Sequence, residues 1–359
     1  MPSSFRPAAI ALALGLAALA PAAQALNIVL TGAATMQADQ FAAIQTAARY
    51  WENRLTDNVT VYLAVSFADV GGNSLASTNV DKTSVSYSAL RGLLASDASA
   101  SSATDASVVS HLQPGTALRF LSTQGDFNTY QDQDGSLNNS RLMLTTANAK
   151  ALGIATVNDT TAPDARIRFA SAFTGSFAYS RVDGQVPADK IDFISVAQHE
   201  IGHALGFVSG VDDVDFCIDN AGQCGLGNIA PAQRFEGDAW YMPLDLFRYS
   251  APGQMDVTLG SAHAGARYFS VDGGTTALQP FTTGRFHGDG QQADHFGGAA
   301  TLMNPILNPG QTRDATAVDL MALDAIGWNV AVTAVPEPQT WALLLGGLAA
   351  IGALRRRRG

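Results

Sequence analysis

The sequence is poor in charge, in cysteine, in histidine and in glutamate. Only 14% of its 359 residues are charged, and 21 basic residues stand against 31 acidic ones. A nucleic-acid-binding protein needs a basic footprint, so this balance excludes nucleic acid as an expected partner. Two cysteines allow one disulfide at most. With six histidines and four glutamates in the chain, a motif that combines both residue types seldom arises by chance.

The scarce residues meet in one motif. His199, Glu200 and His203 form the pattern HExxH, and Gly206 follows three residues later. Shuffling this composition would produce HExxH roughly once in a thousand tries. Positions i and i+4 share one face of a helix, so both imidazoles can reach one metal ion, and Glu200 is placed to act on a metal-bound water. We expect Gly206 to end the helix in a left-handed cap. The alternative is a surface helix with two stray histidines.

The first 25 residues read as a secretory signal peptide. Arg6 gives a weakly basic start, residues 8–20 form an apolar run, and Ala23-Gln24-Ala25 is a cleavage site of the A-x-A type. The mature chain is therefore expected to begin near Leu26. The alternative is a buried N-terminal helix.

The C-terminus carries a second targeting signal. It reads Val335-Pro336-Glu337-Pro338, then an apolar run over 341–354, then four arginines at 355–358. This order resembles the PEP-CTERM sorting signal of Gram-negative bacteria. The resemblance implies an exosortase-type sorting enzyme as a partner, transient membrane anchoring, and a final place at the cell surface or in the extracellular matrix. Residues 331–359 are then a sorting segment. The alternative is a plain membrane anchor, although the apolar run is shorter than a full span.

Between the two ends lies a core of residues 26–330. It keeps 16 basic and 30 acidic residues, a net charge near −14 that suits a soluble exported protein. Apolar periodicity predicts strands at 26–30, at 60–67 and from 166, and helices at 41–55, 191–205 and 318–326. The Ser/Ala/Asp run at 95–110 is expected to be a mobile surface segment. These elements predict an α+β fold with an N-terminal lobe at about 26–206 and a loop-rich C-terminal lobe at about 207–330.

Two smaller features have competing interpretations. Cys217 and Cys224 flank a turn-rich stretch, which predicts a local disulfide in an exported chain; zinc ligation is the alternative. The acidic stretch around Asp132 and Asp134 suggests Ca2+ as a second candidate cofactor. With Gly135 and Asn138 it matches no complete calcium loop, so a solvated turn is the alternative.

A catalytic zinc needs three protein ligands and one open position, so the two histidines are incomplete. Ser209 stands three residues past Gly206, and its side chain cannot serve as the third zinc ligand. At about 20 residues past the motif, where some zinc enzymes use Glu, position 223 is Gln, and Glu236 lies further on. The remaining candidates for the third ligand are Asp212, Asp213, His263, His287 and His295.

One candidate is followed by a distinctive turn. His295 precedes Thr301-Leu302-Met303-Asn304-Pro305. A late histidine before a Met-turn resembles the leishmanolysin branch of the metzincins. The resemblance implies a two-lobed zinc protease domain with a mixed twisted sheet and an active-site helix. It also implies zinc (Zn2+) held by His199, His203 and His295 above Met303.

The same region resembles exported PEP-CTERM proteins with HEIGHALGF-type helices and a closing segment like residues 319–328. The chain departs from the metzincin pattern at Ser209, and it has no tyrosine just after Met303. Tyr241 and Tyr268 are distant alternatives for a residue that stabilises the oxyanion.

The expected function is a zinc metallopeptidase that hydrolyses peptide bonds through a zinc-bound water, with Glu200 as general base. Its partner is a peptide or protein substrate, which the strand over 166–170 is expected to bind by strand addition. Two alternatives stay open. One is a surface or matrix adhesion protein on a relic protease fold, and the other is a zinc hydrolase of a non-peptide amide.

Overall fold

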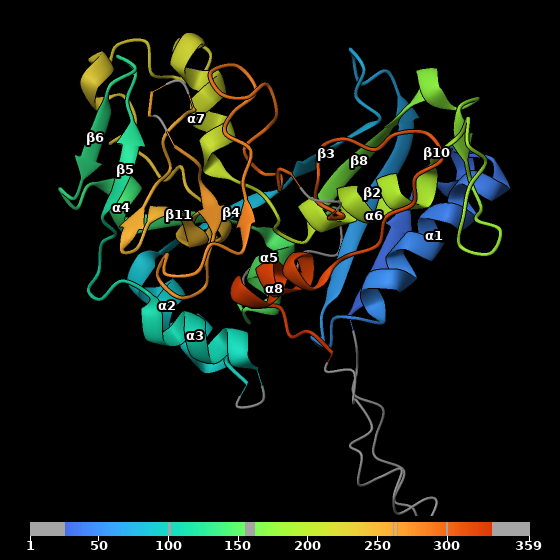
Figure 1. Cartoon of the computed structure of the whole chain (residues 1–359), viewed down its shortest axis with the longest axis horizontal. Coiled ribbons are helices and arrows are strands. Elements are labelled where there is room, and N and C mark those ends of the chain that lie inside the picture. The colour runs from blue at the N-terminus through green and yellow to red at the C-terminus, as the bar shows by residue number, and fades with distance from the viewer. Residues whose placement is uncertain are drawn as a thin grey trace, which may run out of the picture.

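The computed structural model describes residues 26–99, 102–154, 162–260, 262–263, 265–298 and 301–331. These residues form a mixed α+β fold of two lobes, seen side by side in Figure 1. The predicted signal peptide and the sorting segment beyond residue 331 lie outside the described residues. Within the described ranges, no helix is both long enough and apolar enough to cross a membrane.

The first lobe is built on a four-stranded sheet with the order β1-β2-β8-β3. Its strands are β1 (Asn27–Thr31), β2 (Thr60–Ala68), β8 (Ala165–Ala170) and β3 (Ala76–Val80). The first three run parallel, whereas β3 pairs antiparallel with β8 and forms one edge, with β1 at the other. In β2, Val61, Leu63 and Val65 are buried, because alternate side chains of a strand point to one face. The predicted strands are confirmed.

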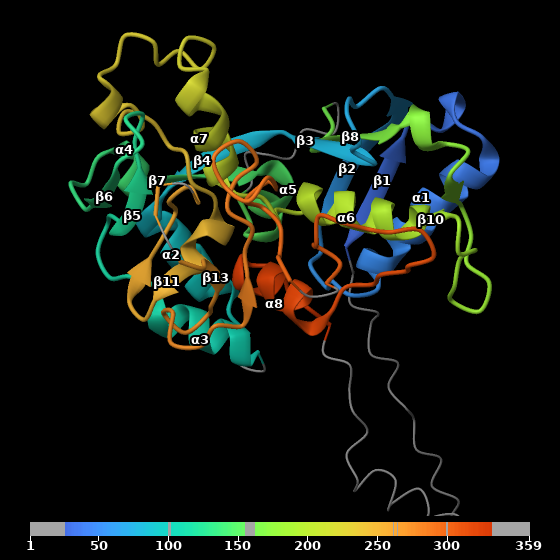
Figure 2. The same cartoon turned by 45° about the horizontal axis from the view of Figure 1, so that its top comes forward.

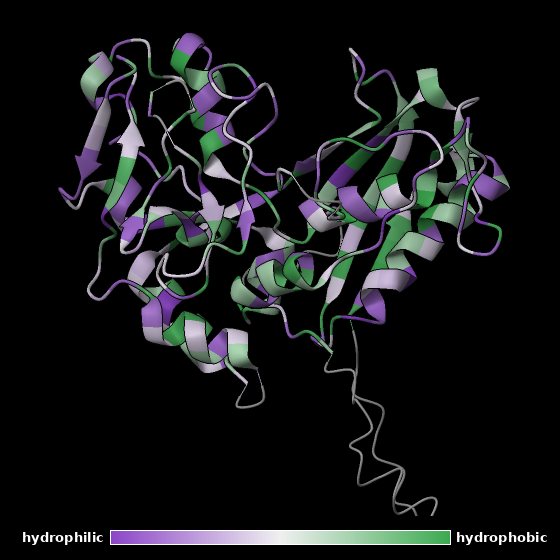
Figure 3. Cartoon of the chain, in the orientation of Figure 1, coloured by the Kyte–Doolittle hydropathy of each residue, from purple (hydrophilic) through white to green (hydrophobic). Residues whose placement is uncertain are grey.

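Two helices of this lobe pack together, α1 (Ala38–Glu52) and α6 (Phe193–Ala204). Both follow the predicted periodicity, and Figure 3 shows hydrophobic residues along them. Two buried tryptophans hold α6 in place. The indole N–H of Trp51 donates to the carbonyl of Gln198 at 3.0 Å, and that of Trp328 donates to the carbonyl of Leu205 at 2.7 Å. The helix that carries HExxH is therefore anchored at its middle and at its end.

The second lobe is an assembly of small sheets and short helices (Figure 2). Its paired strands are β4 (Lys82–Ser86) with β7 (Arg141–Thr145), β5 (Phe120–Thr123) with β6 (Thr129–Asp132), and a sheet of β12 (Gln254–Met255), β11 (Arg248–Ala251), β13 (Tyr268–Phe269) and β14 (Gln279–Pro280). Its helices are α2 (Tyr87–Asp97), α3 (Ala103–His111), α4 (Leu137–Ser140), α5 (Thr146–Ala151) and α7 (Gly210–Asp219). The last helix, α8 (Ala317–Ala325), lies between the lobes and confirms the predicted final helix.

The chain crosses between the lobes more than once, whereas the sequence predicted one crossing near Gly206. After β3 the chain continues into β4, so the described residues between 82 and 151 lie in the second lobe, and β8 then returns to the first. The reason is the sheet topology. The edge strand β3 ends beside the second lobe, and β4 finds its partner there in β7 rather than in the first sheet.

One prediction about regular structure is wrong. In the described part of residues 95–110, the expected mobile segment is mostly the end of α2 and the helix α3. Ser102 caps α3 and donates to Asp324 at 2.8 Å, while Val108 is buried, so the helix is held by packing against α8. The region after Gly206 is loop-rich, as predicted, and its described residues before α8 form only short helices and strands. It starts with α7, because Ser209 caps that helix by accepting from the N–H of Val211.

Candidate metal centre

Three imidazoles converge on one point between the lobes. His199 and His203 come from successive turns of α6, and His295 comes from the loop after β14. The Nε2 atom of His199 lies 3.0 Å from that of His203 and 3.1 Å from that of His295. In a tetrahedral zinc site with Zn–N bonds of about 2.0–2.1 Å, the ligand nitrogens are separated by roughly 3.3 Å. The three side chains that the sequence predicted as ligands are thus brought to the spacing of a metal site.

The other ring nitrogens explain which way the lone pairs point. The Nδ1 atoms of His199, His203 and His295 lie 2.8, 2.6 and 3.2 Å from the backbone carbonyls of Leu302, Phe207 and Gln292. Carbonyls only accept, so each Nδ1 carries the proton and each Nε2 presents a lone pair to the centre. Three acceptors facing one another at this distance repel, and a cation among them removes the repulsion. The donor set therefore fits zinc.

Gly206 contributes through its backbone, as predicted. Its φ of +119° is a left-handed conformation that turns the chain after α6, and this turn brings the carbonyl of Phe207 back onto His203. A Cβ at this position would lie 3.0 Å from Ile326 and 3.1 Å from Asn148. The backbone conformation thus favours glycine, and the space beside it is tight.

The Met-turn lies against the same histidines. Met303 is buried, the carbonyl of Leu302 accepts from His199, and the carbonyl of Met303 accepts from the N–H of Phe296 at 2.8 Å. The turn itself is held by Asp319 of α8, whose two oxygens accept from the N–H groups of Leu302 and Met303 at 3.0 and 3.1 Å. One short turn therefore positions a ligand of α6 and the segment that carries His295.

Asp294 places a carboxylate behind two of the imidazoles. Its Oδ1 lies 3.0 Å from Nδ1 of His295, and its Oδ2 lies 3.5 Å from Nδ1 of His203. Burial lowers the pKa of His295, but the Asp294 carboxylate outweighs burial and leaves that pKa raised. For His199, burial and the two other imidazoles hold the pKa well below its usual value. His199 is consequently neutral, which is the form that binds metal.

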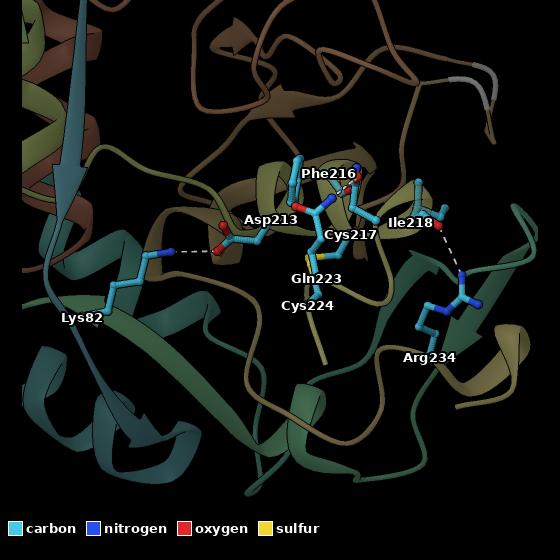
Figure 4. The surroundings of a disulfide bond; sticks show 9 residues. Lys82, Asp213, Phe216, Cys217, Ile218, Gln223, Cys224 and Arg234 are labelled. Atoms are coloured by element: carbon cyan, nitrogen blue, oxygen red, sulfur yellow. Dashed lines mark hydrogen bonds and ion pairs between the residues drawn. A yellow bond between two sulfur atoms is a disulfide. The ribbon is translucent and has the colours of Figure 1, made fainter. Parts of the chain in front are cut away.

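Asp212 has a role that the sequence did not reveal. It was a candidate ligand, but its oxygens accept from the N–H groups of Ala293 and Asp294 at 2.6 and 3.0 Å. Burial and the neighbouring Asp294 raise the pKa of Asp212. This residue from the first turn of α7 holds the backbone that leads into His295. Asp213 instead points away and pairs with Lys82 at 2.7 Å (Figure 4).

Glu200 is buried at the wall of a 680 Å³ cleft that also exposes the three histidines. Burial raises the pKa of this carboxyl group. Its Oε2 accepts a hydrogen bond of 2.6 Å from the hydroxyl of Thr78 on β3. The cleft is lined on one side by β3 and α6, and on the other by the loops around His295 and the Met-turn.

The strand expected to bind a substrate is a different one. The sequence assigned strand addition to residues 166–170, but β8 is paired on both sides, with β2 and with β3. Its backbone groups are therefore already used by the sheet, and that prediction is wrong. The edge strand that lines the cleft is β3, which the sequence did not identify as a strand.

The other histidines lie outside this cluster. Nε2 of His263 lies 3.6 Å from Asp256, and His287 is held between Asp215 at 2.9 Å and Asp219 at 3.1 Å. His111 ends α3.

Ser209 lies away from the ligands, donating to Asp245 at 2.6 Å. Neither Tyr241 nor Tyr268 lines the cleft, so neither is placed to stabilise an oxyanion.

The acidic stretch considered for Ca2+ gathers with Glu236. Oxygens of Asp132, Asp134 and Glu236 all lie within 4.8 Å of one another. Within this group, Glu236 accepts from Ser136 at 2.8 Å, and Asp132 accepts from the amide of Asn138 at 2.9 Å. These hydrogen bonds account for the cluster as a structural network, and Ca2+ stays a prediction.

The predicted disulfide is confirmed. Cys217 and Cys224 are bonded, and the bridge joins the last turns of α7 to the loop after it (Figure 4). Because both sulfurs are used in this bond, the alternative of zinc ligation by the cysteines is excluded.

A comparison with protein families finds the PEP-CTERM protein-sorting motif at residues 334–358. The motif indicates an exported protein sorted to the surface of a Gram-negative bacterium, and it implies recognition by an exosortase-type sorting enzyme. No curated protein and no solved structure matches the chain. The resemblance to metzincins therefore stays a prediction that rests on the residues described above.

Proposed function

We propose that this protein is an exported zinc-dependent endopeptidase. The observation that carries the proposal is the convergence of His199, His203 and His295 at one wall of a cleft that also holds the buried carboxylate of Glu200. Three histidines plus an open position are the donor set of a catalytic zinc, whereas a structural zinc site is closed by four protein ligands.

When bound, zinc would supply a Lewis acid that polarises a carbonyl group and makes a water molecule more acidic. Glu200 accepts the proton of the attacking water as the C–O bond forms at the scissile carbonyl carbon. It then donates that proton to the amine nitrogen as the C–N bond breaks. The free edge of β3 lies along the same cleft, so an extended peptide would add to it as a further strand.

The C-terminal segment indicates where the proposed enzyme would act. Residues 331–359 would anchor the chain in the membrane transiently before an exosortase-type enzyme releases it to the surface or matrix. A relic fold used for adhesion is less well supported, because an adhesion module does not need a buried general base held by a hydrogen bond. A zinc hydrolase of a non-peptide amide would use the same residues and differs only in substrate.

The test compares Glu200→Gln with the unchanged protein and with Glu52→Gln, a matched substitution in α1. All three should bind zinc equally, because Glu200 is not a ligand. Hydrolysis of a peptide library should fall about 100-fold or more for Glu200→Gln alone, since an amide cannot accept the proton. Equal hydrolysis by Glu200→Gln would contradict the assignment of the base. A zinc-loaded parent that cleaves small amides but no peptide would favour the non-peptide alternative.

A further inference from the structure

We propose that Thr78 is a positioning residue that couples the docking of an extended substrate on β3 to the orientation of Glu200. This inference rests on the proposed endopeptidase function. Thr78 belongs to the edge strand through its backbone and to the base through its side chain, so one residue links the two parts of the cleft.

The backbone of Thr78 faces the open side of the sheet. At one end of β3, the backbone carbonyl of Leu75 accepts from the N–H of Ala170 at 2.9 Å. Just past the other end, the N–H of Asp81 donates to the backbone carbonyl of Asp164 at 2.9 Å. The backbone hydrogen-bonding groups of the odd-numbered residues Leu75 and Asp81 thus point towards β8. In an antiparallel pair the backbone groups of successive residues point alternately to the two sides, so the N–H and C=O of Thr78 point away from β8. They lie at the edge to which a further strand would bind.

The side chain of Thr78 reaches α6. Its hydroxyl donates to Oε2 of Glu200 at 2.6 Å and lies 3.1 Å from the backbone carbonyl of the same residue. A hydrogen bond to a charged group is among the stronger ones in proteins. It anchors one carboxylate oxygen and leaves Oε1 to take the proton from water. Because a β-branched side chain is restricted at χ1, the position of the hydroxyl follows the backbone of β3.

The coupling follows from these two contacts. A substrate strand that bonds to the N–H and C=O of Thr78 restrains the backbone of β3 at that residue. The restrained hydroxyl then holds Glu200 in the orientation that proton transfer needs. A substrate bound elsewhere in the cleft would not bring this restraint, so Thr78 favours turnover of extended peptides.

The test compares Thr78→Val, which keeps the shape and loses the hydroxyl, with Thr78→Ser, which keeps the hydroxyl. Thr83→Val in β4 repeats the same substitution away from the cleft. For an extended peptide, Thr78→Val should lower kcat about 10- to 100-fold, as expected for losing a hydrogen bond to a charged group. KM and zinc content should stay within about twofold of the parent, because Thr78→Val removes no ligand and no backbone group. Thr78→Ser should restore most of kcat, and Thr83→Val should match the parent.

Three results would overturn the inference while the parent remains an active peptidase: unchanged kcat in Thr78→Val, an effect on KM alone, or no rescue by serine. An inactive parent would instead reject the proposed function. The contact itself is tested without activity by a double-mutant cycle of Thr78→Val and Glu200→Ala on the thermal stability of the zinc-free protein. The two changes should be non-additive, and additive shifts would exclude the coupling.

Discussion

The sulfur of Met303 lies against the backbone of Gly202 in the HExxH helix. A Cβ built on Gly202 would lie 2.8 Å from Sδ of Met303 and 3.6 Å from the ring of Trp51. The glycine between the two helical histidines therefore leaves the space that the Met-turn fills. Helix α6 and the Met-turn are complementary in shape at this point, and the carbonyl of Leu302 next to the sulfur accepts from His199.

Gly202→Ala tests this packing. The added methyl should displace Met303, lower the free energy of unfolding by about 1–3 kcal/mol, and weaken zinc binding by moving the Met-turn. Gly92→Ala is the matched control, because Gly92 lies in α2 with nothing within 4 Å of the added Cβ. That substitution should be neutral or stabilising, by up to about 1 kcal/mol. Denaturant unfolding and zinc titration give both quantities. If Gly202→Ala behaves like Gly92→Ala, the Met-turn does not depend on the space beside Gly202.

His295→Ala should lower zinc affinity by more than about 100-fold, because the loss of a partner behind a metal ligand already costs about 10- to 100-fold. His263→Ala should bind zinc like the parent, since its imidazole lies beside Asp256 rather than in the cluster. Competition with a chromogenic chelator measures each affinity. Parent-like binding by His295→Ala would show that another residue is the third ligand.

The pH dependence of stability is tested at Asp97. Burial raises the pKa of Asp97 to about 6, and Asp57, Asp105 and Asp324 add to the effect by their charge. The ordinary value is about 4, so between pH 4 and about 6 the folded state binds more protons than the unfolded state. The contribution of Asp97 to the free energy of unfolding is thus fully present at about pH 4. It is lost as the pH rises through about 6.

Asp97→Asn should therefore raise the melting temperature at pH 7, and the gain should shrink towards zero at pH 4. An asparagine can still accept from the amide of Asn329, which now lies 3.1 Å from Asp97. The exposed Asp189 provides a matched control, Asp189→Asn, whose melting temperature should follow that of the parent at both pH values. A gain that is larger at pH 4 than at pH 7 would reverse the sign and refute the argument.

The disulfide should stabilise the end of α7 without affecting the metal centre. Replacing both Cys217 and Cys224 with serine should lower the free energy of unfolding by about 2–3 kcal/mol, because the bridge closes only a short loop. Zinc affinity should be unchanged, since Asp212 lies in the first turn of α7 and the bridge in its last. In the parent, alkylation should require a reductant. Reactive thiols in the native, air-exposed protein would contradict the pairing.

The sequence by itself determined the local elements of the site and its chemical character. The HExxH spacing determines that His199 and His203 share one face, because the period of an α-helix is a local property of the backbone. The glycine at 206 determines the end of α6 in the same way, since a positive φ is cheap only for glycine. The periodicity of α1, β2 and α8 was read correctly because each buries one face of a regular element.

Only the tertiary structure decided how these parts meet. His295 could be singled out by its Met-turn, but its position depends on Asp212 and Asp319, which act on backbone groups more than 15 residues away in sequence. Hydrogen bonds to backbone amides leave no pattern in the sequence. The free edge of β3, and the place of Thr78 on it, follow from strand order. Strand order is set by long-range packing in three dimensions, so it cannot be read from the periodicity of single strands.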